Sequence, residues 1–206
     1  MTDIASKFAD IPTTSISDAM RGLTNMHPAI KPLKEEYRFA GRALTVKTAA
    51  GDNLAVLQAI RQAKPGDVLV IDAKGDEYRA VAGDFIVGIS QTLGVTAWVV
   101  DGVIRDVTGI KELGLPVFCR GTTIAASGKA GIGEVNVPVS CGGVTVHPGD
   151  ILVGDADGVT VIPQAIAESV LAKAKQKLEQ DEARERKVAG KQDEIIAYLD
   201  NMLKLS

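Results

Sequence analysis

Apolar and polar residues follow one another along this chain with two periodicities, one typical of strands and one of helices. Residues 40–48 alternate small or apolar side chains with polar ones, which predicts a strand with one solvent-facing side. Residues 68–72, 95–100 and 151–155 are short, nearly continuous apolar runs, typical of buried strands. Residues 54–63 have the apolar spacing of a helix. The run 95–100 is the strand around which we expect the chain to be organised.

Further elements are expected toward the carboxyl end. Residues 116–119 and 159–163 predict short strands, and residues 135–146 alternate around a Gly-Gly pair, which predicts one or two strands with a bend. Residues 164–188 predict one long helix with an apolar stripe in its first half. Its portion 177–187 is too polar to be buried wholly within its own subunit. We therefore expect that portion to lie over a neighbouring subunit or in solvent.

The length and charge of the chain narrow the classes of protein to consider. A chain of 206 residues most simply forms one domain, expected over residues 1–163, with residues 164–206 as a C-terminal helical segment. The net charge of -3 offers no basic surface for nucleic acid. No apolar run approaches the roughly 20 residues of a membrane span, and residues 1–20 lack a signal-peptide pattern, so a cytoplasmic location is expected. Cys119 and Cys141 form neither a CxxC pair nor a disulfide framework, and we expect buried thiols.

Charged residues follow the central strand at a place where α/β proteins bind ligands. Arg105 and Asp106 come shortly after the apolar run 95–100, and the carboxyl ends of such strands are where ligands dock. Arg presents a fork suited to a carboxylate, and Asp is a hard ligand suited to Mg²⁺. Asp84 opens a helix-like run whose first N–H groups, on Phe85 and Ile86, favour an anion. A surface salt bridge beside a helix-capping Asp84 remains an equally available interpretation.

Other motifs either exclude an enzyme class or leave a role open. No HExxH, GxSxG, Walker A or dinucleotide fingerprint is present. His27 and His147 are isolated, and each precedes a proline, so we expect turn residues. Any metal site would then be rich in oxygen, which favours Mg²⁺ or Mn²⁺ over Zn²⁺. Lys129 lies in a glycine-rich loop, residues 121–133, either as a solvated lysine or as a positive charge near a developing enolate.

Five segments carry a resemblance to a known family: GDNLAVLQAI, PGDVLVID, AGDFIVGISQTLG, VVDGVIRDVTGIKELGLPVFCRGTT and VNVPVSCGGVTVHPGDILVGDADGVTVIP. Over about residues 10–190 the chain resembles the family that contains 4-hydroxy-4-methyl-2-oxoglutarate aldolase and the regulator of ribonuclease E activity. The resemblance implies an α/β/β/α sandwich with a central β core. It also implies a homotrimer, or a hexamer made of trimers, with sites at subunit interfaces.

In the aldolase branch, the resemblance implies a class II aldolase that depends on Mg²⁺ or Mn²⁺. Such an enzyme cleaves 4-hydroxy-4-methyl-2-oxoglutarate, or a related 4-hydroxy-2-keto acid, to pyruvate, and it also decarboxylates oxaloacetate. By the same resemblance, Arg105 would bind the pyruvate carboxylate and Asp106 would hold the metal. Asp84 would orient a metal-bound water.

The resemblance assigns roles to further residues and also offers a different function. The amides of Phe85 and Ile86 would help to grip the carboxylate, and Lys129 would lie near the enolate oxygen. A glutamate from the neighbouring subunit's C-terminal helix would complete the site, with Glu179 and Glu182 as the candidates. The alternative is a protein regulator that binds and inhibits a ribonuclease without catalysis.

Overall fold

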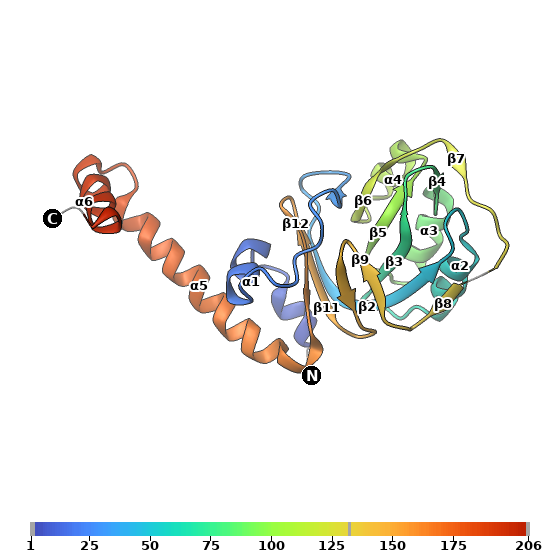
Figure 1. The fold of residues 1–206 in the computed structure, drawn as a ribbon, viewed down its shortest axis with the longest axis horizontal. Helices are drawn as coiled ribbons and strands as arrows, with labels where there is room; N and C mark the ends of the chain where they lie inside the picture. Colours follow the sequence, from blue (N-terminus) through green and yellow to red (C-terminus); the bar gives the residue numbers. More distant parts are fainter. Residues whose placement is uncertain (1–2, 132, 205–206) are drawn as a thin grey trace.

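The apolar runs of the sequence form one mixed, eight-stranded sheet (Figure 1). The computed structural model describes residues 3–131 and 133–204. Three of the expected segments therefore lie partly outside the described residues: the domain at residues 1 and 2, the glycine-rich loop at residue 132, and the C-terminal segment at residues 205 and 206. The strands are joined in the order β1-β6-β5-β3-β2-β11-β12, and β8 pairs with β2. Their bounds are β1 (Lys31–Pro32), β2 (Phe39–Thr48), β3 (Asp67–Asp76), β5 (Ala97–Ile104), β6 (Val117–Thr122), β8 (Gly133–Val135), β11 (Ile151–Asp155) and β12 (Gly158–Ile162).

The core strands β2, β3, β5 and β6 run parallel, and the outer strands are antiparallel to their neighbours. Three helices cover the parallel part of the sheet, because one face of each packs on the aliphatic side chains of these strands. These helices are α2 (Leu54–Gln62), α3 (Asp84–Thr92) and α4 (Val107–Leu113). Two further ladders lie outside the sheet, formed by β9 (Val139–Cys141) with β10 (Val144–Val146) and by β4 (Arg79–Ala80) with β7 (Ala125–Ala126).

A second group of helices packs at the other end of the sheet, on β11 and β12. Side chains of Ile151, Val153 and Ile162 form an apolar cluster there with Ile16 and Val170. The elements that supply this layer are η1 (Ile4–Phe8), α1 (Thr13–Ala19), η2 (Gln164–Ile166) and the first half of α5 (Ala167–Val188). Helices therefore cover the same side of the sheet at both of its ends.

The sheet curls so strongly that its two ends approach each other. The rings of Phe39 in β2 and Phe118 in β6 lie 5.1 Å apart, although β3 and β5 separate the two strands. A flat sheet would place those strands about 14 Å apart. The β9–β10 hairpin fills the concave side with Val139, Cys141 and Val146. The layers are thus helix, sheet, sheet and helix, which confirms the α/β/β/α sandwich with a central β core.

Most of the elements expected from periodicity are present, but the central strand is longer than predicted. Strand β5 continues through Ile104, so Asp101 lies inside it and is only 7% exposed. Its carboxylate accepts a hydrogen bond from Arg120 Nε and one of 2.8 Å from the Gly142 N–H. These partners make burial of the charge tolerable. The two cysteines are free and buried, as expected, and burial raises the pKa of Cys119 to about 11.

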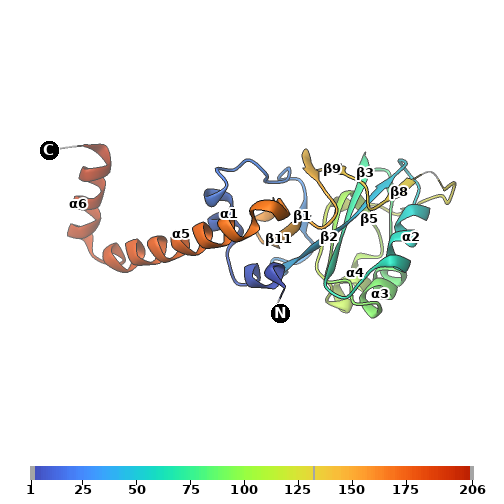
Figure 2. The ribbon, with the colours of Figure 1, turned by 90° about the horizontal axis from the view of Figure 1, so that it is seen from below.

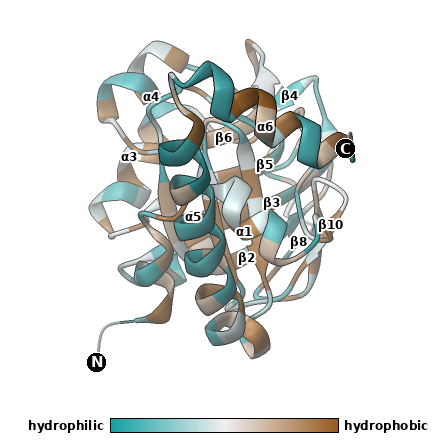
Figure 3. Cartoon of the chain, turned by 90° about the vertical axis from the view of Figure 1, so that its left-hand side faces the viewer, coloured by the Kyte–Doolittle hydropathy of each residue, from teal (hydrophilic) through white to brown (hydrophobic). Residues whose placement is uncertain are grey.

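The carboxyl-terminal helices leave the body of the molecule (Figure 2). Helix α5 runs to Val188, where the helix predicted over 164–188 was expected to end, and α6 (Gln192–Leu203) follows it as a separate helix. We call residues 175–203 the C-terminal arm, because Ala174 is the last buried residue of α5 and α6 has none. The far half of α5 is largely hydrophilic in Figure 3, in line with the expectation for 177–187. None of the described helices is long and apolar enough to cross a membrane.

Candidate active site

A cavity of about 380 Å³ opens beyond the carboxyl end of β5. Its walls come from three segments of chain, residues 80–86, 105–106 and 126–129, together with Asn53. Hydrogen bonds join the first two segments, since Val81 N–H donates to Val103 O and Arg105 N–H donates to Ala82 O. The cavity brings together six of the residues singled out from the sequence: Asp84, Phe85, Ile86, Arg105, Asp106 and Lys129.

Arg105 presents its guanidinium to this cavity. Its Nε lies 3.2 Å from Asp106 Oδ2, and the side chain remains 41% exposed. Within the described residues, no other hydrogen bond or ion pair engages the guanidinium. The terminal nitrogens of Arg105 are therefore available to a carboxylate, which an arginine fork binds through two parallel hydrogen bonds.

Asp106 has an unusual backbone. Its φ of 56° and ψ of 43° place it in the left-handed region, immediately before α4. Asp and Asn adopt that region more readily than other non-glycine residues, and such conformations are concentrated at functional sites. The turn directs the carboxylate of Asp106 toward Gly83, where a Cβ atom would overlap its Oδ2. The start of α4 and the start of α3 thus meet at this carboxylate.

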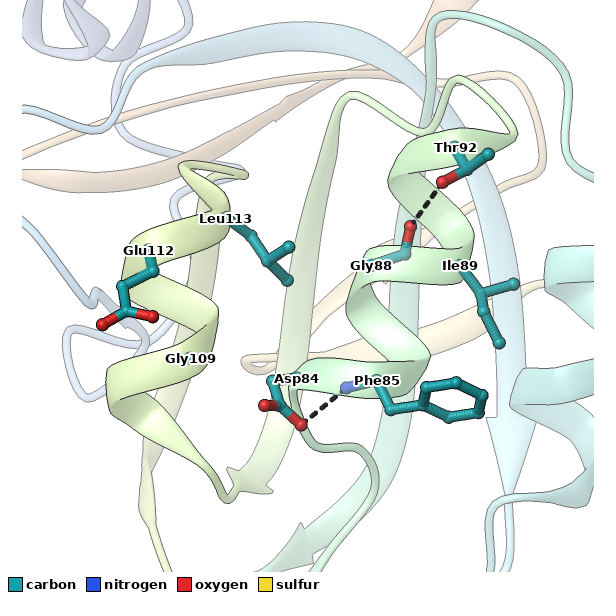
Figure 4. A pocket seen from close by; sticks show the side chains of 8 residues that line it. All are labelled: Asp84, Phe85, Gly88, Ile89, Thr92, Gly109, Glu112 and Leu113. Carbon is teal, nitrogen blue, oxygen red and sulfur yellow. Dashed lines mark hydrogen bonds between the residues drawn. The ribbon is translucent and has the colours of Figure 1, made fainter.

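Asp84 and the first amides of α3 form the adjoining wall. Asp84 Oδ1 accepts a hydrogen bond of 2.7 Å from the Phe85 N–H (Figure 4). The Val87 N–H donates to Gly83 O. The Phe85 amide, one of the two predicted to grip a substrate carboxylate, therefore already has a partner. The Ile86 N–H has none among the described residues, and the positive end of the α3 dipole lies at the same place. Ile86 is the amide of the pair that is open to an anion.

A second, larger groove of about 680 Å³ adjoins the first and runs between α3 and α4. Asp84 and Phe85 line both. Figure 4 shows the Asp84 carboxylate in the gap between the two helices, beside Gly109 of α4. The rest of the groove is mixed in character, with Ile89 from α3 on one side and Leu113 and Glu112 from α4 on the other. Asp84 thus lies where the cavity and the groove meet.

Lys129 is held more firmly than a glycine-rich loop suggests. The carboxylate of Asp52, only 3% exposed, accepts N–H hydrogen bonds from Ala130, from Gly131 at 3.3 Å and from Leu54 at 2.9 Å. The amide of Leu54 is the main cause of the lowered pKa of this carboxyl, and the two loop amides lower the pKa further. Asp52 therefore fastens the loop that carries Lys129 to the start of α2. Sequence reasoning missed this role, because Asp52 precedes a helix and has the pattern of an ordinary cap.

Glu179 and Glu182 lie elsewhere. Both are exposed on the far half of α5, and neither lines the cavity of the same chain. Glu182 Oε2 accepts a hydrogen bond of 3.4 Å from Arg186 Nη1 on its own helix. Figure 1 shows α5 extending away from the end of the molecule that holds α3 and α4. Within one chain, these two glutamates do not meet the other candidates.

The donor groups of the cavity suit Mg²⁺ better than Zn²⁺. The described residues contain no cluster of three or more His, Cys, Asp or Glu side chains able to hold an ion. Zn²⁺ sites in proteins use three or four such ligands. Mg²⁺ keeps several waters and is commonly bound through one or two carboxylates and a substrate. Asp106, with a side chain that is 45% exposed, fits the second pattern, and Asp84 adds a carboxylate to the same cavity.

The sequence and the fold match a known family of proteins. The family model described as RraA-like, Aldolase/RraA, matches residues 13–161, and the chain belongs to this family. A protein of Halalkalibacterium halodurans named "Putative 4-hydroxy-4-methyl-2-oxoglutarate aldolase" is 59% identical over 201 residues, which are 98% of this chain and 96% of that protein. The alignment therefore extends through most of the C-terminal arm.

Two solved structures show the same architecture. An uncharacterised protein from Pseudomonas syringae pv. tomato has a TM-score of 0.84 at 26% identity and covers 95% of this chain and 92% of its own. The RNA-processing inhibitor RraA from Thermus thermophilis has a TM-score of 0.68 at 31% identity. It covers 75% of this chain and 93% of its own, so a quarter of this chain has no counterpart in it. The fold is thus shared by proteins with different described functions, and function has to be argued from the site.

Proposed function

We propose that this protein is a divalent-metal-dependent aldolase that cleaves 4-hydroxy-4-methyl-2-oxoglutarate, or a related 4-hydroxy-2-keto acid, to pyruvate, and that it also decarboxylates oxaloacetate. The observation that carries the proposal is the content of one cavity: a free arginine fork, an open helix-start amide, two carboxylates and a lysine. The 59% identity to a protein named as such an aldolase supports the choice of reaction.

Binding of the substrate follows from the charges on the two sides of the cavity. The carboxylate at C1 of the keto acid pairs with the guanidinium of Arg105, which has free nitrogens. The Ile86 N–H, at the positive end of α3, adds a second donor. Asp106 holds Mg²⁺ or Mn²⁺. When bound, such an ion polarises the 2-keto group as a Lewis acid.

Asp84 and Lys129 act on the proton and on the negative charge that the cleavage produces. The bond between C3 and C4 breaks, its electron pair delocalises into the C2 carbonyl as an enolate, and the hydroxyl-bearing C4 becomes the ketone of the second product. Asp84 accepts the proton of the C4 hydroxyl, and the ammonium of Lys129 offsets the negative charge on the enolate oxygen. Return of this proton from Asp84 to C3 then gives pyruvate. Loss of CO₂ from oxaloacetate passes through the same enolate, so the same groups serve both reactions.

Assembly is part of this proposal. A homotrimer, or a hexamer of trimers, brings the arm of one subunit to the cavity of the next and supplies Glu179 or Glu182 as a further acidic group. The arm has the composition for this role, because its apolar side chains, among them Ile196, Leu199 and Met202, are largely exposed in the described part of the chain. Apolar surface of this kind on a projecting helix is typical of a contact with another chain.

A ribonuclease regulator is the second candidate, favoured by the structural likeness to the Thermus RNA-processing inhibitor. In that case the protein acts through its surface, and the cavity has no catalytic task. Two features weigh against it. Carboxylates directed into a cavity beside a free arginine serve catalysis better than surface contact, and the relative named as an aldolase aligns with nearly the whole chain.

The deciding experiment measures pyruvate release from 4-hydroxy-4-methyl-2-oxoglutarate and from oxaloacetate, each with Mg²⁺, with Mn²⁺ and with excess EDTA. The proposal expects turnover of both keto acids that EDTA abolishes and added metal restores. The same preparation is titrated into a ribonuclease E cleavage assay. Inhibition of RNA cleavage at stoichiometric protein, without release of pyruvate from either acid, would establish the regulator instead.

A further inference from the structure

Two glycines touch the two carboxylates of the cavity in a reciprocal arrangement. Gly83 stands at the start of α3 and faces the carboxylate of Asp106 at the start of α4. Gly109 lies within α4 and faces the carboxylate of Asp84 at the start of α3 (Figure 4). Each helix thus supplies one carboxylate and one glycine surface on which the other helix's carboxylate rests.

The atoms nearest to the space beside each glycine belong to the aspartate, and at Gly83 the next one, Arg105 Cγ, lies at an ordinary contact distance of 3.4 Å. A Cβ at Gly83 would overlap Asp106 Oδ2 and lie 3.1 Å from Asp106 Cγ. A Cβ at Gly109 would overlap Asp84 Oδ2 and lie 2.8 Å from Asp84 Cβ and 3.0 Å from its Cγ. Real Cβ atoms do not approach other atoms so closely, so an alanine at either position would force the carboxylate to move.

Backbone conformation does not explain these glycines. Gly83 has φ -123° and ψ -173°, an extended conformation open to any residue. Gly109 lies inside a helix, where glycine is less stable than alanine because it loses more conformational freedom on folding. What both positions require is the absence of a side chain.

We infer that Gly83 and Gly109 are positioning residues for the proposed reaction: Gly83 sets the carboxylate that holds the metal, and Gly109 sets the carboxylate that takes the proton. The inference rests on the proposed function for the roles of Asp106 and Asp84. Because the contacts are separate, substitutions at the two glycines have separable effects. A group displaced by about 1 Å in an active site can cost about 10²-fold in rate.

Gly88 provides a matched control. It is a helix-interior glycine of α3 that faces the same groove, and a Cβ there would meet only Leu113 methyl groups at 3.6 Å, an ordinary contact. Gly88→Ala is therefore expected to leave turnover and Mg²⁺ binding within about twofold of the wild type, since an alanine fits and favours the helix.

The first experiment compares kcat with Mg²⁺ affinity, the latter by calorimetry on metal-free protein without substrate. Gly83→Ala is expected to weaken Mg²⁺ binding about 10-fold to 100-fold, as is usual when the support of a metal ligand is lost. Gly109→Ala is expected to leave Mg²⁺ binding within about twofold and to lower kcat about 10²-fold. Equal losses in both quantities for both variants would overturn the division of roles.

The second experiment needs no activity. The change in unfolding midpoint caused by Gly109→Ala is measured in the wild type and in an Asp84→Gly background, and that caused by Gly83→Ala in the wild type and in an Asp106→Gly background. Alanine is expected to destabilise the protein only where the aspartate is present, because removal of the aspartate side chain opens the space. Equal effects in both backgrounds would overturn the inference. A wild type that turns over neither keto acid would overturn the proposed function, whereas this cycle still tests the glycine contacts.

Discussion

The two ends of this molecule treat acidic residues in opposite ways. At the cavity, Asp84, Asp106 and Asp52 are each held by neighbours that fix their direction, although two of them are exposed to solvent. On the C-terminal arm, Glu179 is exposed and has no hydrogen bond or ion pair among the described residues, and Glu182 pairs only with its own helix. Contacts within one chain fix the carboxylates of the first end. Among the described residues, Glu179 and Glu182 have no such contact beyond their own helix.

A single chain therefore completes its own site at the cavity but not on the arm. Carboxylates that are fixed by backbone amides and glycine surfaces lose little entropy when substrate binds, which is a form of preorganisation. A glutamate on a projecting helix gains a fixed direction only through contact with a second body. The comparison predicts that substitutions at the cavity change chemistry without changing assembly, whereas changes in the arm alter both.

The largest effect is expected from removal of the charge that holds the metal. Asp106→Asn keeps a residue that tolerates the left-handed backbone, so the turn into α4 is retained while the anionic ligand is lost. Pyruvate release is expected to fall to the background rate, and calorimetry should show no Mg²⁺ binding. Asp157→Asn, in the turn between β11 and β12, serves as the control with full activity. An Asp106→Asn protein with wild-type metal affinity would place the ion elsewhere.

A smaller but still large effect is expected from removal of the arm. A chain that ends at Gln176 keeps every buried residue of α5, so its unfolding midpoint should stay close to that of the full chain. Its turnover is expected to fall at least about 10²-fold, the usual contribution of a general acid or base, and light scattering should show a smaller particle than the trimer or hexamer of the full chain.

A second truncation separates the two parts of the arm. A chain that ends at Ala189 lacks α6 but keeps Glu179 and Glu182. If α6 serves assembly, this protein should lose the oligomer and regain activity only at high protein concentration. A fully active monomer that ends at Gln176 would show that the site is complete within one chain.

The smallest effect is expected at Asp52, and it depends on pH. Asp52→Asn removes the anionic acceptor of three amides, and a loss of about 1–3 kcal/mol in the free energy of unfolding is expected at pH 7. The folded protein lowers the pKa of this carboxyl below its ordinary 3.8, so the stabilisation is complete above pH 3.8 and is lost as pH falls through the folded-state value.

Urea unfolding at pH 7 and at several values below pH 4 tests this sign. The difference between the wild type and Asp52→Asn should shrink as pH falls, whereas Asp10→Asn, at an exposed position, should behave as the wild type throughout. A difference that stays constant with pH would mean that the charge of Asp52 does not carry the effect. Turnover should fall only a few-fold, since the loop of Lys129 loses one anchor while Lys129 keeps its charge.

Much of the fold could be predicted because burial leaves a direct trace in the sequence. The runs 68–72 and 95–100 are almost continuously apolar, and they form β3 and β5 with helices on one side and a hairpin on the other. The extension of β5 through Asp101 could not be predicted, because it depends on Arg120, which lies 19 residues away. Helix α4 was also missed, since Val107–Leu113 is short and starts from a left-handed residue without a capping side chain.

The reactive residues of the site could be predicted from the sequence, but the residues that position them could not. Arg105 and Asp106 are adjacent and follow an apolar strand, so their meeting with Asp84 at the carboxyl end of that strand could be expected from topology. That Asp52 would bind the loop of Lys129 from 78 positions away could not be inferred from one sequence, since a carboxylate before a helix caps it in most proteins. The contribution of Glu179 and Glu182 to the active site depends on a second chain, and it stays a prediction.

The curled sheet also determines how copies of this protein can associate. Its last strand, β12, is covered along its outer side, because Met26 N–H donates to Val159 O and Val161 N–H donates to Thr24 O. Its first strand, β1, is only two residues long and contains Pro32, which has no N–H to offer a partner. Close by, Lys31 Nζ donates a hydrogen bond of 2.6 Å to Asp157 O and ties the two ends together. Because neither of these two edges, β1 or β12, is open to a further strand, subunits are not expected to join there through a continuous sheet, and the same two edges offer no ready template for β-aggregation.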